Sequence, residues 1–587
     1  MNNETDVRPT RFTRRVLVRT AILAVFTQCG GGIGLASAKP RSSGRSELPP
    51  FDPYARPLAS GPSSSRVPAI GMTPSVPGAP YIVPLQPEWS VISLMTAGNA
   101  ARSGYHMSGV PDGLGAFDNG DGTITLLMNH EFDAGQSVVR GHGGRGAFVS
   151  RWRIDIASLE ALEGRDMVSS PDNWHMWAGR VWKSARRVLA GPRKQSGAAS
   201  KLAKLQGPRH ADVDIDRLCS ADSAPVSAFW HAELGVGYNG HILLNGEESE
   251  RRHSRAFAWV DAPSAVYELP AFQTGKFGDN ANPPPEWENL LANPKPGVNT
   301  IVIANSDGGP SQIYVYIGRK QRSGSPIEKA GLTNGSLYSL RVEAVDEESR
   351  EANIGLTKSL QGRGSSAPVK LVPAGKGTSF LRPEDGAWDP RNPDIYYFAT
   401  TDRNNYASPD SVADGPDAAQ VGRSRLWAIT FDDVQRIDPG GKSTARIELL
   451  VDGTEGGDMF DNITIDRQGV VYLCEDTGEA RHNGKIWAYD TNTGSMTAIT
   501  KFDPALFGDV ALKIYRPPTA PFIDDKETSG ILDVTELFER APWFKAGSTV
   551  LLTTVQPHFG YDGSVPLGRN IYEGGQLVML VKAPSQG

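Results

Sequence analysis

An all-β fold built from about six strand-rich units is predicted by two features of this sequence. The 587 residues include 64 glycines and 43 prolines without long amphipathic helical runs, which favours short strands joined by turns. The second feature is a recurring unit, in which a polar turn precedes an apolar strand that ends in acidic, amide or histidine residues. Units of this kind with unequal spacing are typical of a β-propeller with irregular loop insertions, and a β-sandwich is the alternative.

The apolar strands of the recurring unit can be followed along the chain. We expect them at 123–128, 242–244, 301–303, 395–398, 470–473 and 550–552. Their ends carry Asn129-His130-Glu131, Asn245-Gly246-Glu247-Glu248, Asn305-Ser306-Asp307, Thr401-Asp402, Glu475-Asp476 and Gln556-Pro557-His558. Because equivalent strand ends of a propeller converge on the mouth of its channel, we expect these polar side chains to meet in space.

The first residues of the chain are expected to be a targeting signal. Arg14 and Arg15 lie in a twin-arginine pattern, an apolar stretch continues to Phe26, and a small-residue cleavage site ends at Ala38. The alternative, a membrane anchor, needs a longer apolar stretch to span a core of ~30 Å. We therefore expect a signal peptide at 1–38, recognition by the twin-arginine export machinery, and a periplasmic or secreted mature protein.

The rest of the chain is divided by composition. A Pro-, Ser- and Gly-rich stretch predicts a flexible linker at 39–80, followed by one domain at 81–587. A net charge of −6 argues against a nucleic-acid binder, which needs a basic face. We expect a monomer that acts on a small molecule.

Carboxylates that follow several strands provide the oxygen ligands that hard cations require. A single such residue is usually a solvated turn residue, but here the pattern recurs. Of the cysteines, Cys219 and Cys474 lie beyond the signal. They are candidates for a disulfide in an oxidising compartment, and the alternative is that Cys219 is a thiolate metal ligand.

The segment from Leu381 to Asp389 has the most specific pattern. The guanidinium of Arg382 offers a planar fork of donors that matches two phosphate oxygens. Glu384 lies two positions further on, on the same side of an extended strand, where it can hold a metal. The alternative for these two residues is a surface ion pair beside a proline turn.

This segment resembles the Arg-Pro-Glu-Asp motif of the PhoX-type alkaline phosphatases, and other segments resemble motifs of that family in the same order. The similarity runs from roughly residue 81 to the C-terminus. The matching segments are Asn129-His130-Glu131, Arg217-Leu218-Cys219-Ser220, Asn245-Gly246-Glu247-Glu248, Gly275-Lys276-Phe277, Trp287-Glu288-Asn289, Asn305-Ser306-Asp307 and Phe460-Asp461-Asn462.

The resemblance implies a six-bladed propeller that hydrolyses phosphate monoesters with bound Ca2+ and Fe3+. By the same resemblance, Cys219, Glu288 and Glu384 are expected to hold iron, and Glu248, Asp307 and Asp461 to hold calcium or to bridge metals. Glu131 is expected to be a further metal ligand. Arg382 is expected to bind the phosphate, so that Arg382 and Cys219 are the candidate catalytic residues. A thiolate beside carboxylates suits iron better than calcium.

Two departures from the family pattern leave other functions open. The Trp-Gly-Thr-Trp-Leu stretch that precedes the family's Cys-Glu-Glu segment is missing, and Trp287 stands where the family has a histidine before Glu288. The alternatives are a propeller hydrolase of phytase-like or lactonase type that uses calcium alone, and a non-catalytic binding propeller stabilised by calcium.

Overall fold

The architecture was analysed in a computed structural model. It describes residues 78–190, 213–249, 254–273, 285–308, 311–343, 345–348, 362–401, 424–441, 444–478, 483–508, 518–560, 568 and 570–584. The expected signal peptide, most of the expected linker and the Gly275-Lys276-Phe277 segment lie outside these residues. Within them, no helix has the length and hydrophobicity needed to cross a membrane.

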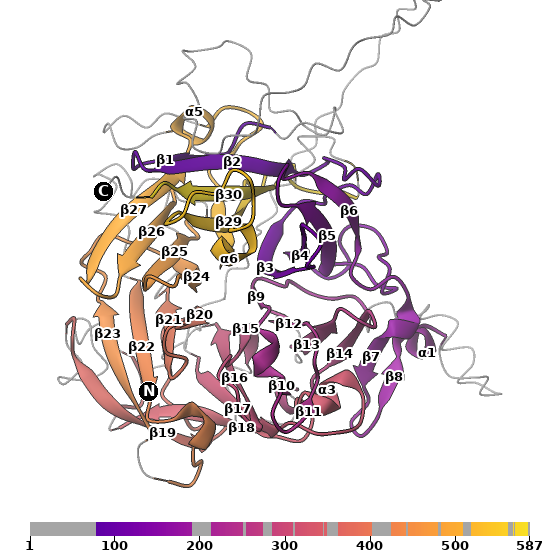
Figure 1. Cartoon of the computed structure of the whole chain (residues 1–587), viewed down its shortest axis with the longest axis vertical. Coiled ribbons are helices and arrows are strands. Elements are labelled where there is room, and N and C mark those ends of the chain that lie inside the picture. The colour runs from indigo at the N-terminus through magenta and orange to yellow at the C-terminus, as the bar shows by residue number, and fades with distance from the viewer. Residues whose placement is uncertain are drawn as a thin grey trace, which may run out of the picture. The chain divides into compact units, whose positions relative to one another are not determined.

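The domain is almost entirely β, which confirms the all-β part of the predicted fold class (Figure 1). The few helices of the described residues are single turns at the periphery of the sheets. They are α1 (Ala185–Leu189), α3 (Pro326–Lys329), α5 (Pro504–Phe507) and α6 (Thr535–Phe538), with 3-10 turns at Pro171–Asn173, Val226–Ala228, Pro270–Phe272 and Val434–Arg436.

Two sheets are formed by the N-terminal part of the domain. The first is an antiparallel meander of β3 (Pro111–Asp118), β4 (Thr123–His130), β5 (Phe148–Asp155) and β6 (Ala161–Asp166). The second sheet has six strands in the order β8-β7-β14-β13-β12-β9. They are β7 (Trp174–Trp177), β8 (Trp182–Ser184), β9 (Ala221–Asp222), β12 (Ile242–Gly246), β13 (Ala256–Val260) and β14 (Ala265–Glu268), with a separate hairpin of β10 (Trp230–His231) and β11 (Val236–Gly237).

The middle of the chain forms a nine-stranded sheet made of two meanders joined at their outer edges by β19 (Ser366–Pro373). Its first and last strands, β15 and β20, also contact each other, so this sheet is nearly closed. The first meander is β15 (Glu286–Ala292), β16 (Asn299–Asp307), β17 (Ile313–Arg319) and β18 (Ser336–Val342). The second is β20 (Pro383–Trp388), β21 (Ile395–Thr400), β22 (Arg425–Phe431) and β23 (Ala445–Val451).

The last two sheets each include a strand from the start of the domain. In one, β1 (Ile82–Pro84) pairs with the outer strand of β24 (Phe460–Ile465), β25 (Val470–Glu475), β26 (Lys485–Asp490) and β27 (Ser495–Phe502). In the other, β2 (Trp89–Thr96) pairs with β30 (Gln576–Lys582), beside β29 (Thr549–Gln556) and β28 (Glu527–Asp533). The start of the domain is thus hydrogen-bonded into both of these sheets, and its last strand, β30, pairs with β2 in the second.

One edge strand from each sheet or meander contacts the next in a closed series. β3 contacts β9, β9 contacts β15, β15 contacts β20, β20 contacts β24, β24 contacts β28, and β28 returns to β3. Figure 1 shows the sheets arranged around these inner strands. Residues far apart in the sequence are therefore brought together at the centre.

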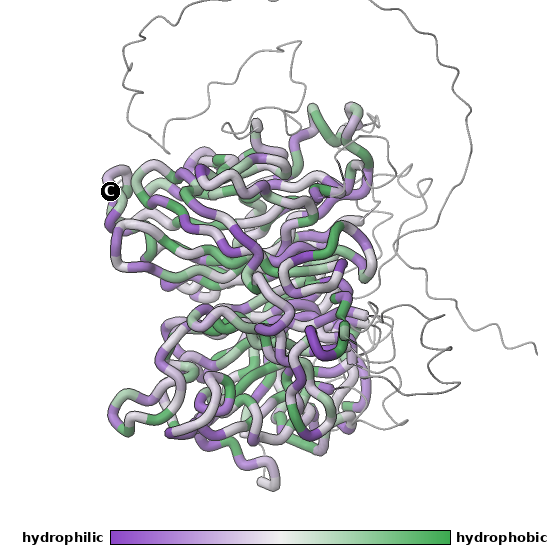
Figure 2. Tube along the Cα trace, turned by 90° about the vertical axis from the view of Figure 1, so that its right-hand side faces the viewer, coloured by the Kyte–Doolittle hydropathy of each residue, from purple (hydrophilic) through white to green (hydrophobic). Residues whose placement is uncertain are grey.

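Hydrophobic layers fill the space between neighbouring sheets. In one layer, Leu126 of β4 and Trp152 of β5 pack with Leu552 of β29 and Met579 of β30. All four side chains are buried. Each such side chain contributes about 1.5–3 kcal/mol when it is fully buried. Figure 2 shows apolar residues distributed along the strands of the domain and polar residues at many of the bends.

The same irregularity occurs in five of the inner strands. The register shifts between Pro111 and Leu114 in β3, between Trp287 and Asn289 in β15, between Pro383 and Gly386 in β20, between Phe460 and Ile463 in β24, and between Thr528 and Ile531 in β28. Bulges of this kind bend a strand, turn a side chain away from strict alternation and are common next to active sites. Here four of the five bulges hold acidic residues, and the bulge in β28 holds Ser529 and Gly530.

Candidate metal centre

Buried carboxylates and one thiol meet at the centre of the domain. They form four groups in which possible ligand atoms lie within 4.8 Å of one another. The groups are Cys219-Glu248-Glu288, Glu288-Glu384-Asp461, Asp461-Asp476-Glu527 and Asp112-Glu131-Glu527. Because Glu288, Asp461 and Glu527 each belong to two groups, the four form one continuous cluster, which we call the central acidic cluster.

Two positions in the strand pattern provide most of the central acidic cluster. The bulges of the inner strands provide one set. The ends of the strands that pair with the inner strands provide the other. The first set is Asp112, Glu288, Glu384 and Asp461, and the second is Glu131, Glu248 and Asp476. Asp307, at the end of β16, lies against the cluster and belongs to none of its four groups. The same backbone geometry therefore delivers a ligand from one sheet after another.

The inner strands can approach one another closely because glycines follow several of the acidic residues. A Cβ atom at Gly530 would lie 2.5 Å from the carbonyl oxygen of Asp112, and one at Gly113 would lie 2.3 Å from the amide nitrogen of Ala221. Real Cβ atoms do not make contacts this short. Glycine at these positions thus allows carboxylates from different sheets to share one cluster.

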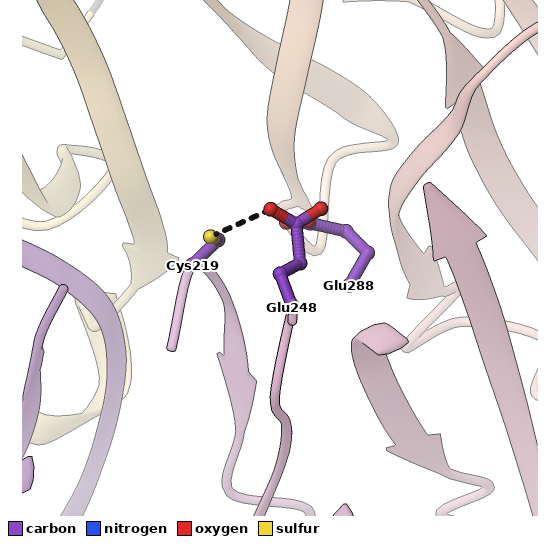
Figure 3. A group of neighbouring side chains, drawn as sticks. All are labelled: Cys219, Glu248 and Glu288. Carbon is purple, nitrogen blue, oxygen red and sulfur yellow. Dashed lines mark hydrogen bonds between the residues drawn. The ribbon is translucent and has the colours of Figure 1, made fainter. Parts of the chain in front are cut away.

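Cys219 lies at the end of the cluster that is formed by Glu131, Glu248 and Glu288. Its Sγ atom lies 3.0 Å from Glu131 Oε1 and 3.2 Å from Glu248 Oε2, so that the single thiol hydrogen can be donated to either carboxylate, and Figure 3 shows the sulfur facing the carboxylate of Glu248. Cys474 is fully buried in β25, and its thiol donates to the Ser529 carbonyl at 3.2 Å. Neither cysteine forms a disulfide. The disulfide alternative is therefore wrong, and Cys219 is available as a ligand.

Burial and mutual repulsion work against the charged forms of this cluster. Burial, reinforced by Glu248 and Asp461, raises the pKa of Glu288 well above its usual range. Burial and then Glu131 raise the pKa of Asp112 in the same way, and burial raises the pKa of Glu384 despite the opposing effect of Arg382. Burial followed by Glu131 and Glu248 also raises the pKa of the Cys219 thiol. Nearby positive charge is therefore needed to keep these groups ionised together.

Arg382 provides part of that positive charge at the edge of the cluster. Its Nε and Nη2 atoms donate to the two oxygens of Asp307 at 2.9 and 2.7 Å, and Nη2 lies 2.8 Å from Glu384 Oε1. Burial opposes ionisation of Asp307, but Arg382 outweighs it and lowers the pKa of that carboxyl. The side chain of Glu384 is only 4% exposed, so this is not the surface ion pair considered as an alternative.

All predicted site residues therefore lie in or against the central acidic cluster. The sequence-based interpretation missed Asp112 and Glu527 and did not assign Asp476 as a ligand. Asp112 could have been found, because Pro111-Asp112-Gly113 precedes a β-strand in the way that Pro383-Glu384-Asp385 does. Glu527 lies in β28, one strand before the apolar strand expected at 550–552, and no comparable motif marks it in the sequence.

The donors present fit metal cations. Glu288 Oε1 and Gln556 Oε1 are buried and have no hydrogen-bond partner among the residues that the structure describes, and both belong to residues that face the cluster. Gln556 Nε2 donates to Asp112 Oδ2 at 2.7 Å and to Glu131 Oε2 at 3.2 Å, which leaves its oxygen for another partner. Carboxylate and amide oxygens suit calcium, whereas a thiolate beside carboxylates suits a softer metal such as iron.

His558 lies beside Glu527 at the margin of the cluster. Its Nδ1 atom is 3.1 Å from Glu573 Oε2, and its Nε2 atom is 3.9 Å from Glu527 Oε2. Burial opposes protonation, but Asp525, Glu527 and Glu573 outweigh it and raise the pKa of the imidazole well above its usual value. A protonated His558 adds to the positive charge of Arg382 and of Arg217, whose Nη2 atom lies 3.2 Å from Glu248 Oε2.

Comparisons with known proteins found likeness in structure only. No protein-family model and no curated protein matches the sequence. The structure is similar to PhoX of Pseudomonas fluorescens in complex with vanadate, a transition-state analogue, with 12% identity, a TM-score of 0.49 and coverage of 87% of this chain and 98% of that one. It is also similar to a GH43_1 enzyme from Xanthomonas citri, with 11% identity, a TM-score of 0.27 and coverage of 80% and 86%.

Proposed function

We propose that this protein is a metal-dependent hydrolase of phosphate monoesters, similar to the PhoX-type alkaline phosphatases. The observation that carries the proposal is the central acidic cluster, in which a thiol and many carboxylates from successive sheets share ligand positions beside Arg382. Such a concentration of buried acids is unfavourable unless cations bind to it. The motifs that carry the resemblance supply its members in the family's order.

The proposed fold is a six-bladed propeller with the cluster at its centre. The closed series of inner strands supports six units, of which the nine-stranded sheet would supply two. The pairing of β2 with β30 supports ring closure, because the first and last parts of the domain complete one sheet.

Within this proposal, Cys219, Glu288 and Glu384 hold Fe3+, and Glu131, Glu248, Asp307 and Asp461 hold or share Ca2+. Asp112, Asp476 and Glu527 extend the oxygen ligand set at the other end of the cluster. When bound, the metals would neutralise the phosphate charge and activate the attacking oxygen. The carboxylates fix the positions of the cations, and burial excludes bulk water from most of the ligand atoms.

Arg382 is proposed to bind the phosphate oxygens. Its guanidinium already makes a two-pronged contact with the carboxylate of Asp307, and phosphate presents a similar pair of oxygens. The left-handed backbone at Arg382, with φ of 57°, directs this side chain from the residue that immediately precedes β20. A non-glycine residue in this conformation is strained and is often found at functional sites.

We further propose that the protein is exported by the twin-arginine machinery after the metals bind, and that it acts as a periplasmic or secreted monomer without a nucleic-acid partner. Arg14, Arg15 and the small-residue site at Ala38 support this route. The twin-arginine route transports folded proteins, which suits a centre assembled from many sheets.

The test combines metal analysis with turnover of a chromogenic phosphomonoester. Protein purified from an exporting host should contain iron and calcium, hydrolyse the ester, and lose activity on chelation. Calcium without iron would favour the phytase-like or lactonase-type alternative. Metal binding without hydrolysis of any tested ester would favour the binding propeller, and protein that takes up no metal would contradict the proposal.

A further inference from the structure

A fully buried ion pair lies behind the segment that carries Arg382. It joins Glu348, which follows β18, to Arg425, the first residue of β22, and both side chains are 1% exposed or less. Neither residue belongs to the central acidic cluster. Burying two charges in this way is costly and contributes little to stability compared with apolar residues of similar size. The pair therefore calls for a reason other than stability.

The contacts of Glu348 indicate that reason. Glu348 Oε1 accepts from Arg425 Nη1, and Glu348 Oε2 accepts from the backbone amide of Leu381 at 2.8 Å. Leu381 is the residue immediately before Arg382. One carboxylate thus links a buried guanidinium to the backbone that leads into the strained position.

Further contacts hold both sides of the same turn. The amide of Glu348 donates to the Ser379 carbonyl at 2.8 Å, and the amide of Ser311 donates to the Phe380 carbonyl at 2.9 Å. On the other side, the amide of Thr401 donates to the Arg382 carbonyl at 3.0 Å, and the hydroxyl of Thr400 lies 3.4 Å from Glu348 Oε1. The turn is therefore fixed before and after Arg382.

We propose that Glu348 and Arg425 are positioning residues that hold the backbone of Arg382 in its left-handed conformation and so aim its guanidinium at the substrate phosphate. This inference rests on the proposed function. Arg425 holds the carboxylate of Glu348 in place, and that carboxylate holds the Leu381 amide. Without this link, the Arg382 backbone relaxes toward the more favourable right-handed or extended regions, and the side chain leaves the edge of the cluster.

The principal test is Glu348→Asp, which keeps the charge but shortens the side chain, so that one carboxylate no longer reaches both Leu381 and Arg425. Glu268→Asp is the matched control. Glu268 is also a buried glutamate that accepts from a backbone amide, that of Trp177, and pairs with a half-buried arginine, Arg255 at 3.5 Å. It lies in β14, outside the central acidic cluster.

We expect Glu348→Asp to lower kcat/KM for a phosphomonoester by about 100-fold, the scale of a misplaced catalytic group. Metal content should be unchanged, and Glu268→Asp should retain nearly wild-type kcat/KM. The two substitutions should lower Tm by similar amounts. Equal effects of both variants on kcat/KM would overturn the proposal, because a general loss of packing would then explain the result.

A second measurement separates positioning from a structural role. In an Arg382→Ala background, Glu348→Asp should cause little further loss of kcat/KM, because the residue through which it acts is already missing. Losses that multiply would contradict the inference. If Glu348→Asp does not fold, Arg425→Lys takes its place in the same comparison, with Arg151→Lys as the control from the Arg151–Asp261 pair.

Failure of the positioning inference can be distinguished from failure of the proposed function itself. If the metal-loaded wild type hydrolyses no phosphomonoester, the proposed function fails, and crystal structures of the wild type and Glu348→Asp then test the positioning directly. The inference requires positive φ at Arg382 in the wild type and its loss in the variant. Retention of the left-handed backbone in the variant would refute it.

Discussion

At the scale of single residues, Arg382 and Glu384 make different contacts and should fail differently. Arg382→Ala should keep the metals, because Arg382 supplies no ligand atom. It should lower kcat/KM by roughly 100- to 1,000-fold, the usual scale for removing one charge-stabilising donor. Lys should restore only part of this loss, since a point charge cannot make the two-pronged contact. Steady-state kinetics with metal analysis measure both effects.

Glu384→Ala tests the proposed role of Glu384 as a metal ligand. Glu384 shares a group with Glu288 and Asp461, so its removal should lower metal content and Tm together. Arg382→Ala with wild-type kinetics would mean that the arginine is structural. Glu384→Ala with full metal content would remove Glu384 from the ligand set.

The two cysteines provide a second residue-scale prediction. Cys219→Ser should lose iron and activity, because the hydroxyl is a poor replacement for a thiolate ligand. Cys474→Ser should retain both, since Cys474 belongs to none of the four ligand groups and its buried thiol donates to the Ser529 carbonyl. Metal content by mass spectrometry separates the variants. Full iron occupancy in Cys219→Ser would show that the metal is held by carboxylates alone.

At the scale of elements, the close approach of β28 to β3 should be sensitive to one methyl group. In Gly530→Ala, the added Cβ would lie 2.5 Å from the carbonyl of Asp112, so the strands must separate. We expect destabilisation of roughly 1–3 kcal/mol, as for overpacking in a core, with weaker metal binding at the Asp112-Glu131-Glu527 group.

Thermal unfolding of the Gly530 variant with and without metal measures these effects. Gly440→Ala is the control, because its nearest neighbour, Asp438 Oδ1, lies 3.8 Å from the added Cβ. An unchanged Tm and metal affinity for Gly530→Ala would show that the inner strands can separate without cost, contrary to the close packing described here.

At the scale of the whole molecule, metal binding should stabilise the domain because the central acidic cluster joins all its sheets. A ligand that binds only the folded state contributes about 4 kcal/mol when its concentration is 1,000 times its Kd. Exhaustive chelation should therefore lower Tm, and added calcium and iron should restore it. Calorimetry on protein whose metal loss has been verified is the measurement, and an unchanged Tm would argue against a structural metal centre.

Export provides a second whole-molecule prediction. The double substitution Arg14→Lys and Arg15→Lys should leave unprocessed protein in the cytoplasm, because the paired arginines are the element that the twin-arginine machinery recognises. Cell fractionation with detection of the precursor measures this. Normal processing and export of the double variant would indicate the general secretory route instead.

The sequence by itself determined the all-β class, the recurring strand unit and most of the polar residues at the centre. These features depend on local pattern, since apolar runs between turns predict strands and acids at their ends predict ligands. Glu248 and Glu384 follow from this pattern, whereas Glu288, Asp461 and the choice of Cys219 as a ligand are implied by the resemblance to the PhoX-type alkaline phosphatases.

Only the tertiary structure decided which acids share a group and which residues hold them in place. Asp112 and Glu527 join the cluster because β3 and β28 are neighbours, although more than 400 residues separate them in the chain. Bulges and long-range strand contacts set these positions, and neither follows from local periodicity. Local periodicity does not reveal the role of Glu348 and Arg425 either. Their link to Arg382 exists only once separate strands have packed together.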